Sequence, residues 1–110
     1  MSGYKVIITR TAHLDILELT KYIADVKKNR KAAIEHMEGC YRTISSLSDN
    51  PLKYQLSKDP LLFDQSIRFT RFRNYMIAFK VVQETKIVEV YSVLYSASDI
   101  PSRLSERLLE

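Results

Sequence analysis

The sequence predicts an α+β domain of two layers, in which a pair of antiparallel helices packs on one face of an antiparallel sheet and leaves the other face open. Two observations predict this class. Between residues 11 and 47, apolar residues recur with the spacing of two amphipathic helices. Between residues 67 and 95, they alternate with the two-residue period of strands. A strand, a helix pair and then a β-meander together favour the α+β class.

The first two elements are a strand and a helix. Residues 4–9 alternate and are mostly β-branched or aromatic, so we expect a strand there. Apolar residues then follow at steps of four, three, four and three, which predicts a helix of about sixteen residues with Thr11 as its N-cap. These apolar positions are Ala12, Ile16, Leu19, Ile23 and Val26.

A second helix of matching length is predicted after the basic cluster at residues 27–31. The same apolar rhythm resumes there and ends before Pro51, because the position preceding a proline is disfavoured in a helix. Two helices of equal length joined by a short turn most simply form an antiparallel hairpin. The apolar positions of the second helix are Ala33, Met37, Cys40, Ile44 and Leu47.

The C-terminal half is expected to supply the rest of the sheet. Residues 52–66 are irregular and predict an ordered loop with at most one short strand. Residues 67–95 have breaks at 73–74 and 83–86, which predicts three strands in a meander. A short last helix is expected from Pro101, with Ser102 as its cap and Leu104 and Leu108 one turn apart.

Length and composition indicate one domain over residues 1–110. The chain is 45% hydrophobic with two Gly and three Pro, which suits a compact fold. No apolar run approaches the ~18 residues of a membrane span. The first ten residues read as a strand and not as a signal peptide, so we expect a cytoplasmic protein. The single cysteine, Cys40, cannot form an intramolecular disulfide and is expected to be a small buried apolar residue.

The common catalytic and metal-binding motifs are absent from the sequence. It contains no H-E-x-x-H, no G-x-S-x-G and no glycine-rich phosphate loop. Its two histidines, His13 and His36, lie outside the apolar stripes of their helices and are expected to be solvated. We therefore expect no cofactor and no metal site.

The net charge of the chain is concentrated in one β-like segment. Residues 65–82 contain Arg68, Arg71, Arg73 and Lys80 and no Asp or Glu. The charge of this segment therefore equals the formal net charge of the whole chain, +4. Guanidinium groups bind phosphates and aromatic rings stack on bases, so this segment is a candidate phosphate-facing surface. The alternative is a solvated edge strand that only deters aggregation. Strict alternation would place Arg68 on one face and Arg71 and Arg73 on the other, unless the chain turns before Asn74.

Several fragments, in this order and spacing, resemble the RelE/ParE superfamily of toxins from bacterial type II toxin–antitoxin modules, the plasmid stabilisation type. The resemblance spans nearly the whole chain and implies the same strand, helix hairpin and meander. The fragments are Tyr4-Lys5-Val6-Ile7-Ile8-Thr9, Ala12, Asp15-Ile16, Leu47-Ser48-Asp49-Asn50-Pro51, Ile67-Arg68, Asn74-Tyr75-Met76-Ile77-Ala78-Phe79-Lys80-Val81, Val93-Leu94-Tyr95 and Asp99.

The resemblance implies a growth-inhibiting toxin that a cognate acidic antitoxin wraps and neutralises. It implies one of two targets: DNA gyrase for ParE-like members, or ribosome-bound messenger RNA for RelE-like members. Nuclease members often carry basic residues where this chain has Met76 and Ala97-Ser98, so the resemblance favours the ParE-like branch. Arg68 matches a basic family position and is the best candidate for a phosphate contact.

Two further interpretations stay open at this stage. In the first, the chain is a metal-independent, ribosome-dependent endoribonuclease, in which Arg71 and Arg73 replace the missing charges and Arg68 and Tyr95 complete the catalytic set. Tyr95 would there stack on a base or bind a phosphate; otherwise it packs against the C-terminal tail. In the second, the chain is a degenerate toxin that retains only antitoxin binding.

Overall fold

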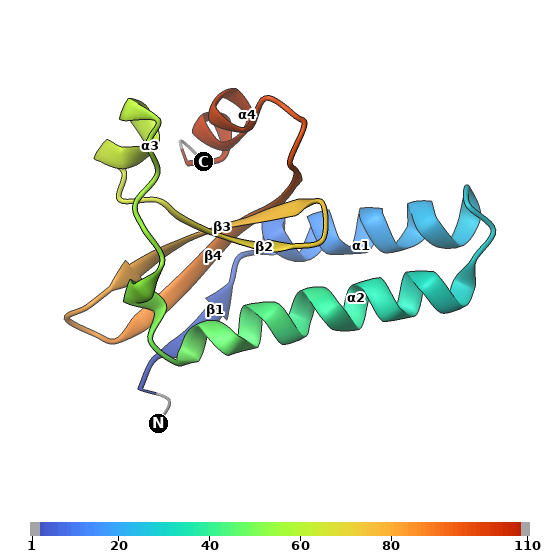
Figure 1. The fold of residues 1–110 in the computed structure, drawn as a ribbon, viewed down its shortest axis with the longest axis horizontal. Coiled ribbons are helices and arrows are strands. Elements are labelled where there is room, and N and C mark those ends of the chain that lie inside the picture. The colour runs from blue at the N-terminus through green and yellow to red at the C-terminus, as the bar shows by residue number, and fades with distance from the viewer. Residues whose placement is uncertain (1–2, 109–110) are drawn as a thin grey trace.

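A computed structural model of the chain describes residues 3–108 and shows a four-stranded sheet between two helical layers (Figure 1). The α+β class and the order of strand, helix hairpin and meander are confirmed. In chain order the elements are β1 (Lys5–Ile8), α1 (Arg10–Asp25), α2 (Arg30–Ser45), the short 3-10 helices η1 (Ser46–Ser48) and η2 (Pro51–Lys53), α3 (Pro60–Asp64), β2 (Arg68–Phe72), β3 (Tyr75–Val82), β4 (Ile87–Tyr95) and α4 (Ile100–Leu108).

The sheet has the strand order β1-β4-β3-β2. The meander strands β2, β3 and β4 are antiparallel as predicted, but β1 pairs with β4 in parallel, which corrects the expectation of a wholly antiparallel sheet. The longest strand, β4, lies second in the sheet, between β1 and β3, so β1 pairs with the last strand of the meander and not with its sequence neighbour. Hydrogen bonds from Lys5 N to Lys86 O and from Thr9 N to Val90 O fix both ends of β1 beside it.

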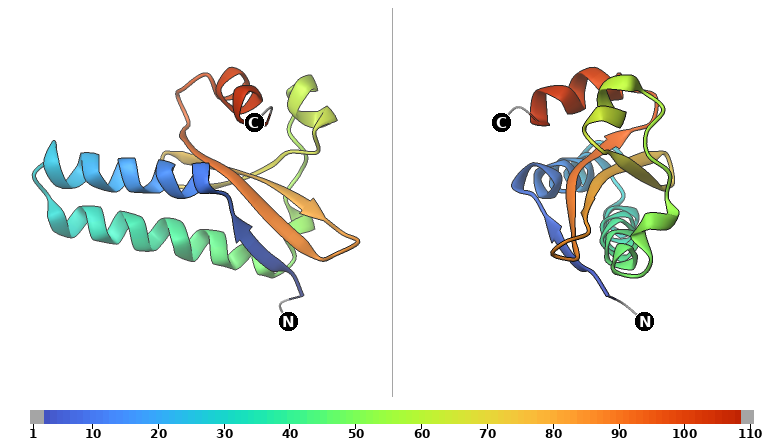
Figure 2. Two further views of the ribbon diagram at one scale, coloured as in Figure 1. Left: turned by 180° about the vertical axis from the view of Figure 1, so that it is seen from behind. Right: turned by 90° about the vertical axis from the view of Figure 1, so that its left-hand side faces the viewer.

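The helix hairpin forms as predicted, with one correction at its start. The N-cap of α1 is Thr9 and not Thr11, because the Thr9 hydroxyl accepts a hydrogen bond from Ala12 N at 3.2 Å. Asn29 caps α2 in the same way by accepting from Ala32 N at 3.0 Å. The two helices lie side by side and extend past the end of the sheet, where the turn between them forms one end of the molecule (Figures 1 and 2).

The main core lies between this hairpin and the sheet. Phe79 at the centre of β3 is fully buried, and most of the predicted α2 stripe belongs to this core. Of the predicted α1 stripe only Ala12 and Ile16 are buried in it, and Val26 is 61% exposed, because the helices extend past the sheet. Cys40 is fully buried there, as expected. The buried members of this core are Ala12, Ile16, Cys40, Ile44, Leu47, Ile77, Phe79, Val88, Val90 and Val93.

A β-bulge in β4 lets three valines of that strand reach this core. Ala78 pairs with Ser92 while its neighbour Phe79 pairs with Val90, so Tyr91 is an extra residue in the ladder. The extra residue reverses the alternation of β4. Val88, Val90 and Val93 consequently all face the main core, although their numbers are not all even or all odd.

The second face of the sheet is covered, which corrects the expectation that it stays open. Residues 52–66 do not form a simple loop, because Asp59 caps a helix, α3, by accepting from Leu61 N and Leu62 N. This helix and α4 pack over the face opposite the hairpin (Figure 2). The second core comprises the buried Leu62, Ile67, Ala78 and Leu104, with Phe69, Tyr91 and Leu108 packed against them.

The helix α4 is longer than the sequence predicted. It begins at Ile100, and Asp99 rather than Ser102 lies at its cap, where its carboxylate accepts from Ser102 N at 3.5 Å. Among residues 3–108, no helix is both long enough and apolar enough to cross a membrane.

We predict that Gly39→Ala destabilises the protein although alanine normally stabilises a helix by about 1 kcal/mol relative to glycine. A Cβ atom at Gly39 would lie 2.1 Å from the ring of Phe72, which packs β2 against α2. The ring must move, and such overpacking costs about 1 to 3 kcal/mol. Urea unfolding of the variant measures the change, and a rise in the free energy of unfolding would contradict this packing.

Candidate functional site

Arg68 is held by the loop that precedes β2. It pairs with Phe79 across the β2–β3 ladder and so lies on the hairpin face of the sheet. The side chain is half-buried, and its guanidinium donates a hydrogen bond to the backbone carbonyl oxygen of Tyr54. Leu56 forms a β-bridge with Arg68 at the same point. One of the five guanidinium donors of the best predicted phosphate contact thus fastens a loop to an edge strand.

Arg71 lies on the opposite face of β2 from Arg68. It pairs with Met76, and its side chain is exposed. The alternation predicted from the strand period therefore separates these two guanidinium groups by the thickness of the sheet.

Arg73 lies in the turn between β2 and β3, next to Asn74. Its φ angle is 53°, in the left-handed region that glycine and asparagine tolerate better than arginine. The exposed guanidinium lies over the ring of Phe72, with its carbon 5.1 Å from the ring centroid. The left-handed conformation costs a non-glycine residue about 1 to 2 kcal/mol, and Arg73 shares it with Lys28, Asn50, Ser66 and Lys86 among the described residues. Its exposure at a turn beside Tyr75 makes it a candidate for function.

Tyr95 ends β4 with 49% of its surface exposed. Its ring is tilted against that of Tyr75, with 5.7 Å between centroids. Both rings line a groove of about 340 Å³ between α1, the ends of β3 and β4, and α4, together with Glu18, Tyr22 and Arg103. Tyr95 is thus available to a partner, and the hydrogen bond from Ser96 N to Asn74 O places this end of β4 beside the turn that carries Arg73.

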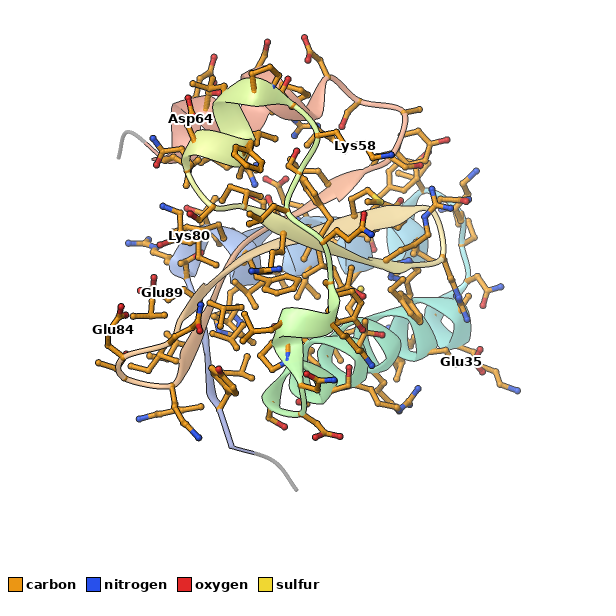
Figure 3. All side chains as sticks on the ribbon, turned by 60° about the vertical axis from the view of Figure 1, so that its left-hand side comes forward. Glu35, Lys58, Asp64, Lys80, Glu84 and Glu89 are labelled. Atoms are coloured by element: carbon orange, nitrogen blue, oxygen red, sulfur yellow. The ribbon has the colours of Figure 1, made fainter. Side chains whose placement is uncertain are left out.

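Lys80, the fourth cation of residues 65–82, contacts other side chains on the α4 side of the sheet. Its ammonium lies 5.4 Å from the Tyr91 ring centroid and 3.4 Å from Gln65 Oε1. Glu89 lies across the ladder from Lys80 and accepts a hydrogen bond from the Tyr91 hydroxyl at 3.0 Å (Figure 3). Burial and this carboxylate raise the pKa of Tyr91 to about 12, so the phenol stays protonated.

His36 is buried, which corrects the expectation that it is solvated; only 4% of its surface is exposed. It packs edge-on against Phe72 and Tyr75, with centroid distances of 5.2 and 5.1 Å. Its Nδ1 lies 3.6 Å from Cys40 Sγ, and its Nε2 has no hydrogen-bond partner among the described residues. Desolvation, followed by the charge of Arg73, lowers the pKa of His36.

His13 and Cys40, the other candidate reactive side chains of the two helices, lie as the sequence predicted. His13 is exposed, with Nδ1 2.9 Å from the Tyr41 hydroxyl. Burial raises the pKa of the Cys40 thiol to about 11, which leaves it a packed thiol and not a nucleophile.

Sequence reasoning missed a buried charge cluster that fastens α4. The carboxylate of Asp15 on α1 accepts hydrogen bonds from Val93 N at 2.9 Å and from the guanidinium of Arg107 at 2.5 Å. Arg107 also donates to the hydroxyl of Ser92 at 2.9 Å. One carboxylate therefore joins α1, β4 and α4, and the only signal in the sequence was an acidic residue in an early turn of α1.

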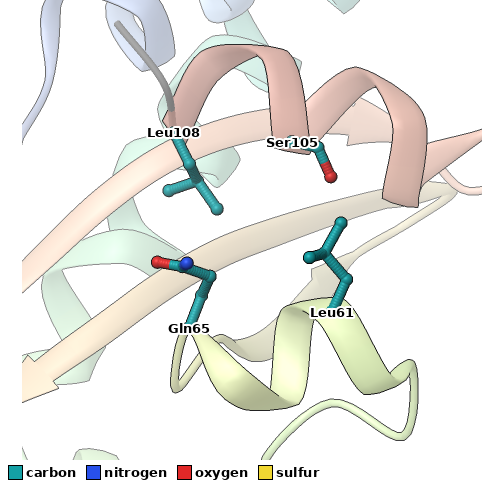
Figure 4. Close-up of a pocket in the computed structure, with 4 residues that line it drawn as sticks. All are labelled: Leu61, Gln65, Ser105 and Leu108. Atoms are coloured by element: carbon teal, nitrogen blue, oxygen red, sulfur yellow. The ribbon is translucent and has the colours of Figure 1, made fainter.

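Another cavity lies between α3 and α4. It holds about 140 Å³ and is lined by Leu61, Gln65, Ser105 and Leu108 (Figure 4). Within residues 3–108, no cluster of three or more His, Cys, Asp or Glu could hold a metal ion. Of the four predicted site residues, Arg68 and Arg71 lie on opposite faces of β2, while Tyr95 ends β4 beside the turn of Arg73.

Comparisons with known proteins identify what the chain is similar to. A family model described as the ParE toxin of the type II toxin–antitoxin system, parDE, matches residues 6–100. A comparison with curated protein sequences finds no match.

Three solved structures share the fold. The chromosomal ParDE toxin–antitoxin system from P. aeruginosa has a TM-score of 0.69 at 14% identity, covering 84% of this chain and 95% of that chain. The E. coli toxin RelE with two arginine-to-alanine substitutions, in the free state, has a TM-score of 0.62 at 18% identity, covering 98% and 99%. The toxin–antitoxin complex RelBE2 from Mycobacterium tuberculosis has a TM-score of 0.54 at 22% identity, covering 86% and 99%. At these identities, the likeness shows the fold alone.

The lowered pKa of His36 predicts that stability falls on acidification. The unfolded chain takes up a proton near the ordinary pKa of 6.5, whereas the folded chain resists it. The stabilisation is therefore complete above pH 6.5 and is lost as the pH falls toward the lower folded-state pKa, by at most about 1.4 kcal/mol per pH unit.

Urea unfolding between about pH 7 and pH 5 tests this, with His36→Leu as the variant that removes the titrating group. We expect a smaller decrease in the free energy of unfolding for His36→Leu than for the unchanged chain. His13→Gln is the matched control and should keep the full decrease. Equal pH dependence in the unchanged chain and in His36→Leu would contradict the assignment.

Proposed function

The chain belongs to the ParE toxin family of type II toxin–antitoxin (parDE) systems, and on this basis we propose that it inhibits growth by poisoning DNA gyrase. The proposal has three parts: the target is gyrase rather than messenger RNA, the inhibitor of the toxin is an acidic antitoxin, and Arg73 contacts the target.

The separation of the basic side chains in space is the observation that supports gyrase over RNA cleavage. Metal-independent cleavage of a phosphodiester requires several cationic or hydrogen-bonding donors around one phosphate. Here Arg68 is bound to the carbonyl of Tyr54, and Arg71 lies on the other face of the sheet. The position after the turn tyrosine is Met76, and Ala97 and Ser98 follow β4, so these positions supply no cation.

The antitoxin proposal is supported by charge and by a free sheet edge. The solved relatives include a ParDE system and a RelBE2 toxin–antitoxin complex. This chain has a formal net charge of +4, which complements an acidic segment. The strand β1 is at the edge of the sheet, with Ile7 39% exposed, and an extended segment that folds on binding would add a strand there.

Arg73 is the residue that we propose for target contact. It is exposed, it occupies a strained backbone position where glycine would be more stable, and Phe72 beneath it is fixed against His36 and α2. A rigid turn that presents one guanidinium is suited to a carboxylate or phosphate of a large partner.

Two assays on the purified chain separate the proposed targets. We expect the chain to inhibit DNA supercoiling by gyrase and to leave ribosome-bound message intact in primer extension. Codon-specific cleavage of the message, with supercoiling unaffected, would overturn the proposal in favour of the endoribonuclease. No effect in either assay, together with normal growth when the chain is expressed without an antitoxin, would identify a degenerate toxin.

Variants at the β2–β3 turn extend the same gyrase experiment. Arg73→Gly relieves the left-handed strain, so it should unfold at equal or higher urea concentration than the unchanged chain while it loses inhibition of gyrase. This combination excludes unfolding as the cause of the loss. Arg42→Gln removes an exposed charge from the last turn of α2 and should inhibit gyrase normally.

A further inference from the structure

The turn between α1 and α2 concentrates positive charge at one end of the molecule. Residues 27–31 hold four cations around Asn29, and no Asp or Glu occurs from residue 26 to residue 34. All five side chains of the turn are exposed. The turn lies at the free end of the hairpin, beyond the sheet, where a large partner can reach it without obstruction (Figures 1 and 2).

Two of these cations are unfavourable for the fold. Because α2 begins at Arg30, both Arg30 and Lys31 lie in its first turn, at the positive end of the helix dipole. Each is unfavourable there, and no acidic residue of that turn compensates. Lys27 and Lys28, in contrast, follow the end of α1, where a cation is favourable.

No partner within the protein explains the charge. Among residues 3–108, no carboxylate forms an ion pair with any of the four side chains, and only Lys27 has a described contact, 5.9 Å from the centroid of the Tyr22 ring. The nearest acidic residue along α2, Glu35, projects away from the sheet (Figure 3). Four unpaired cations at the tip of a rigid hairpin therefore indicate an external polyanion.

We propose that the α1–α2 turn binds the phosphate backbone of duplex DNA. Residues 27–31 themselves carry only charged or polar side chains, while the exposed Tyr22, Val26 and Ile34 flank them on the two helices, so the contact that the turn itself can make is electrostatic. The turn contains no aromatic residue, and the Lys27 ammonium lies over the adjacent Tyr22 ring, which disfavours stacking of an unpaired base there. Point charges on a convex tip match the closely spaced phosphates of a duplex.

DNA binding at this turn goes beyond the proposed function and does not depend on gyrase. The turn is a separate surface from Arg73, and of its cations only Lys27 reaches Tyr22, which lines the groove of Tyr75 and Tyr95. Binding to DNA is measured with DNA alone. A negative result in the gyrase assay therefore leaves DNA binding standing, and a negative result here leaves the gyrase proposal standing.

The experiment is fluorescence anisotropy of a short labelled DNA duplex with the full chain at increasing KCl. The test variant is the triple substitution Lys28→Gln, Arg30→Gln and Lys31→Gln. We expect it to bind at least about tenfold more weakly at about 50 mM KCl. The slope of log affinity against log salt should become shallower by about 0.9 for each phosphate that the variant no longer neutralises, about 2.7 in all.

A matched variant removes three exposed charges elsewhere: Lys5→Gln, Lys58→Gln and Lys86→Gln. It has the same net charge as the test variant and should bind with nearly unchanged affinity and slope. Equal weakening in both triple variants would overturn the inference, because bulk charge would then suffice. No binding by the unchanged chain, or tighter binding to single-stranded RNA or to polyglutamate than to the duplex, would also overturn it. Urea unfolding confirms that both variants are folded.

Discussion

The structure depends on the burial of β4 between two helical layers. Its bulge at Tyr91 directs Val88, Val90 and Val93 toward the helix hairpin, while Asp15 binds its backbone at Val93 and holds α4 through Arg107. Both faces and both edges of β4 are covered along most of its length, so the sheet offers its edge strands, its turns and the exposed end of β4 at Tyr95 for contacts with other molecules. Two clusters of basic residues lie at such places, one on β2 and its turn and one at the α1–α2 turn.

The position of β2 at the sheet edge explains why its arginines act separately. One face of this strand meets the hairpin layer and the other meets the layer of α3 and α4, so a two-residue period sends successive arginines to different environments. Arg68 fastens the loop at Tyr54, Arg71 is exposed on the far side, and Arg73 leaves the strand at the turn. A segment that is one charged patch in sequence is therefore three separate sites in space.

Much of the fold could be predicted because its signals are local. The apolar stripe from Ala33 to Leu47 and the alternation of apolar residues after residue 67 predicted most of the buried residues of the main core. The parallel pairing of β1 and the second core were missed, because they depend on contacts between residues far apart in sequence. The helix α3 was missed for a different reason: it has a local start signal in Asp59 and Pro60 but is only 5 residues long, too short for an apolar period. His36 was misjudged for the same reason: Phe72 and Tyr75, which bury it, come from another layer. The candidate site was predicted in composition but not in geometry, since the backbone carbonyl that binds Arg68 and the left-handed turn at Arg73 leave no pattern in the sequence.

The central claim is that Arg68 serves the fold, and the free energy of unfolding of Arg68→Ala tests it most directly. Loss of a charged hydrogen bond to the Tyr54 carbonyl predicts a decrease of about 1.5 to 3 kcal/mol in urea unfolding. An unchanged free energy of unfolding would contradict the account, because Arg68 would then be free to bind a phosphate.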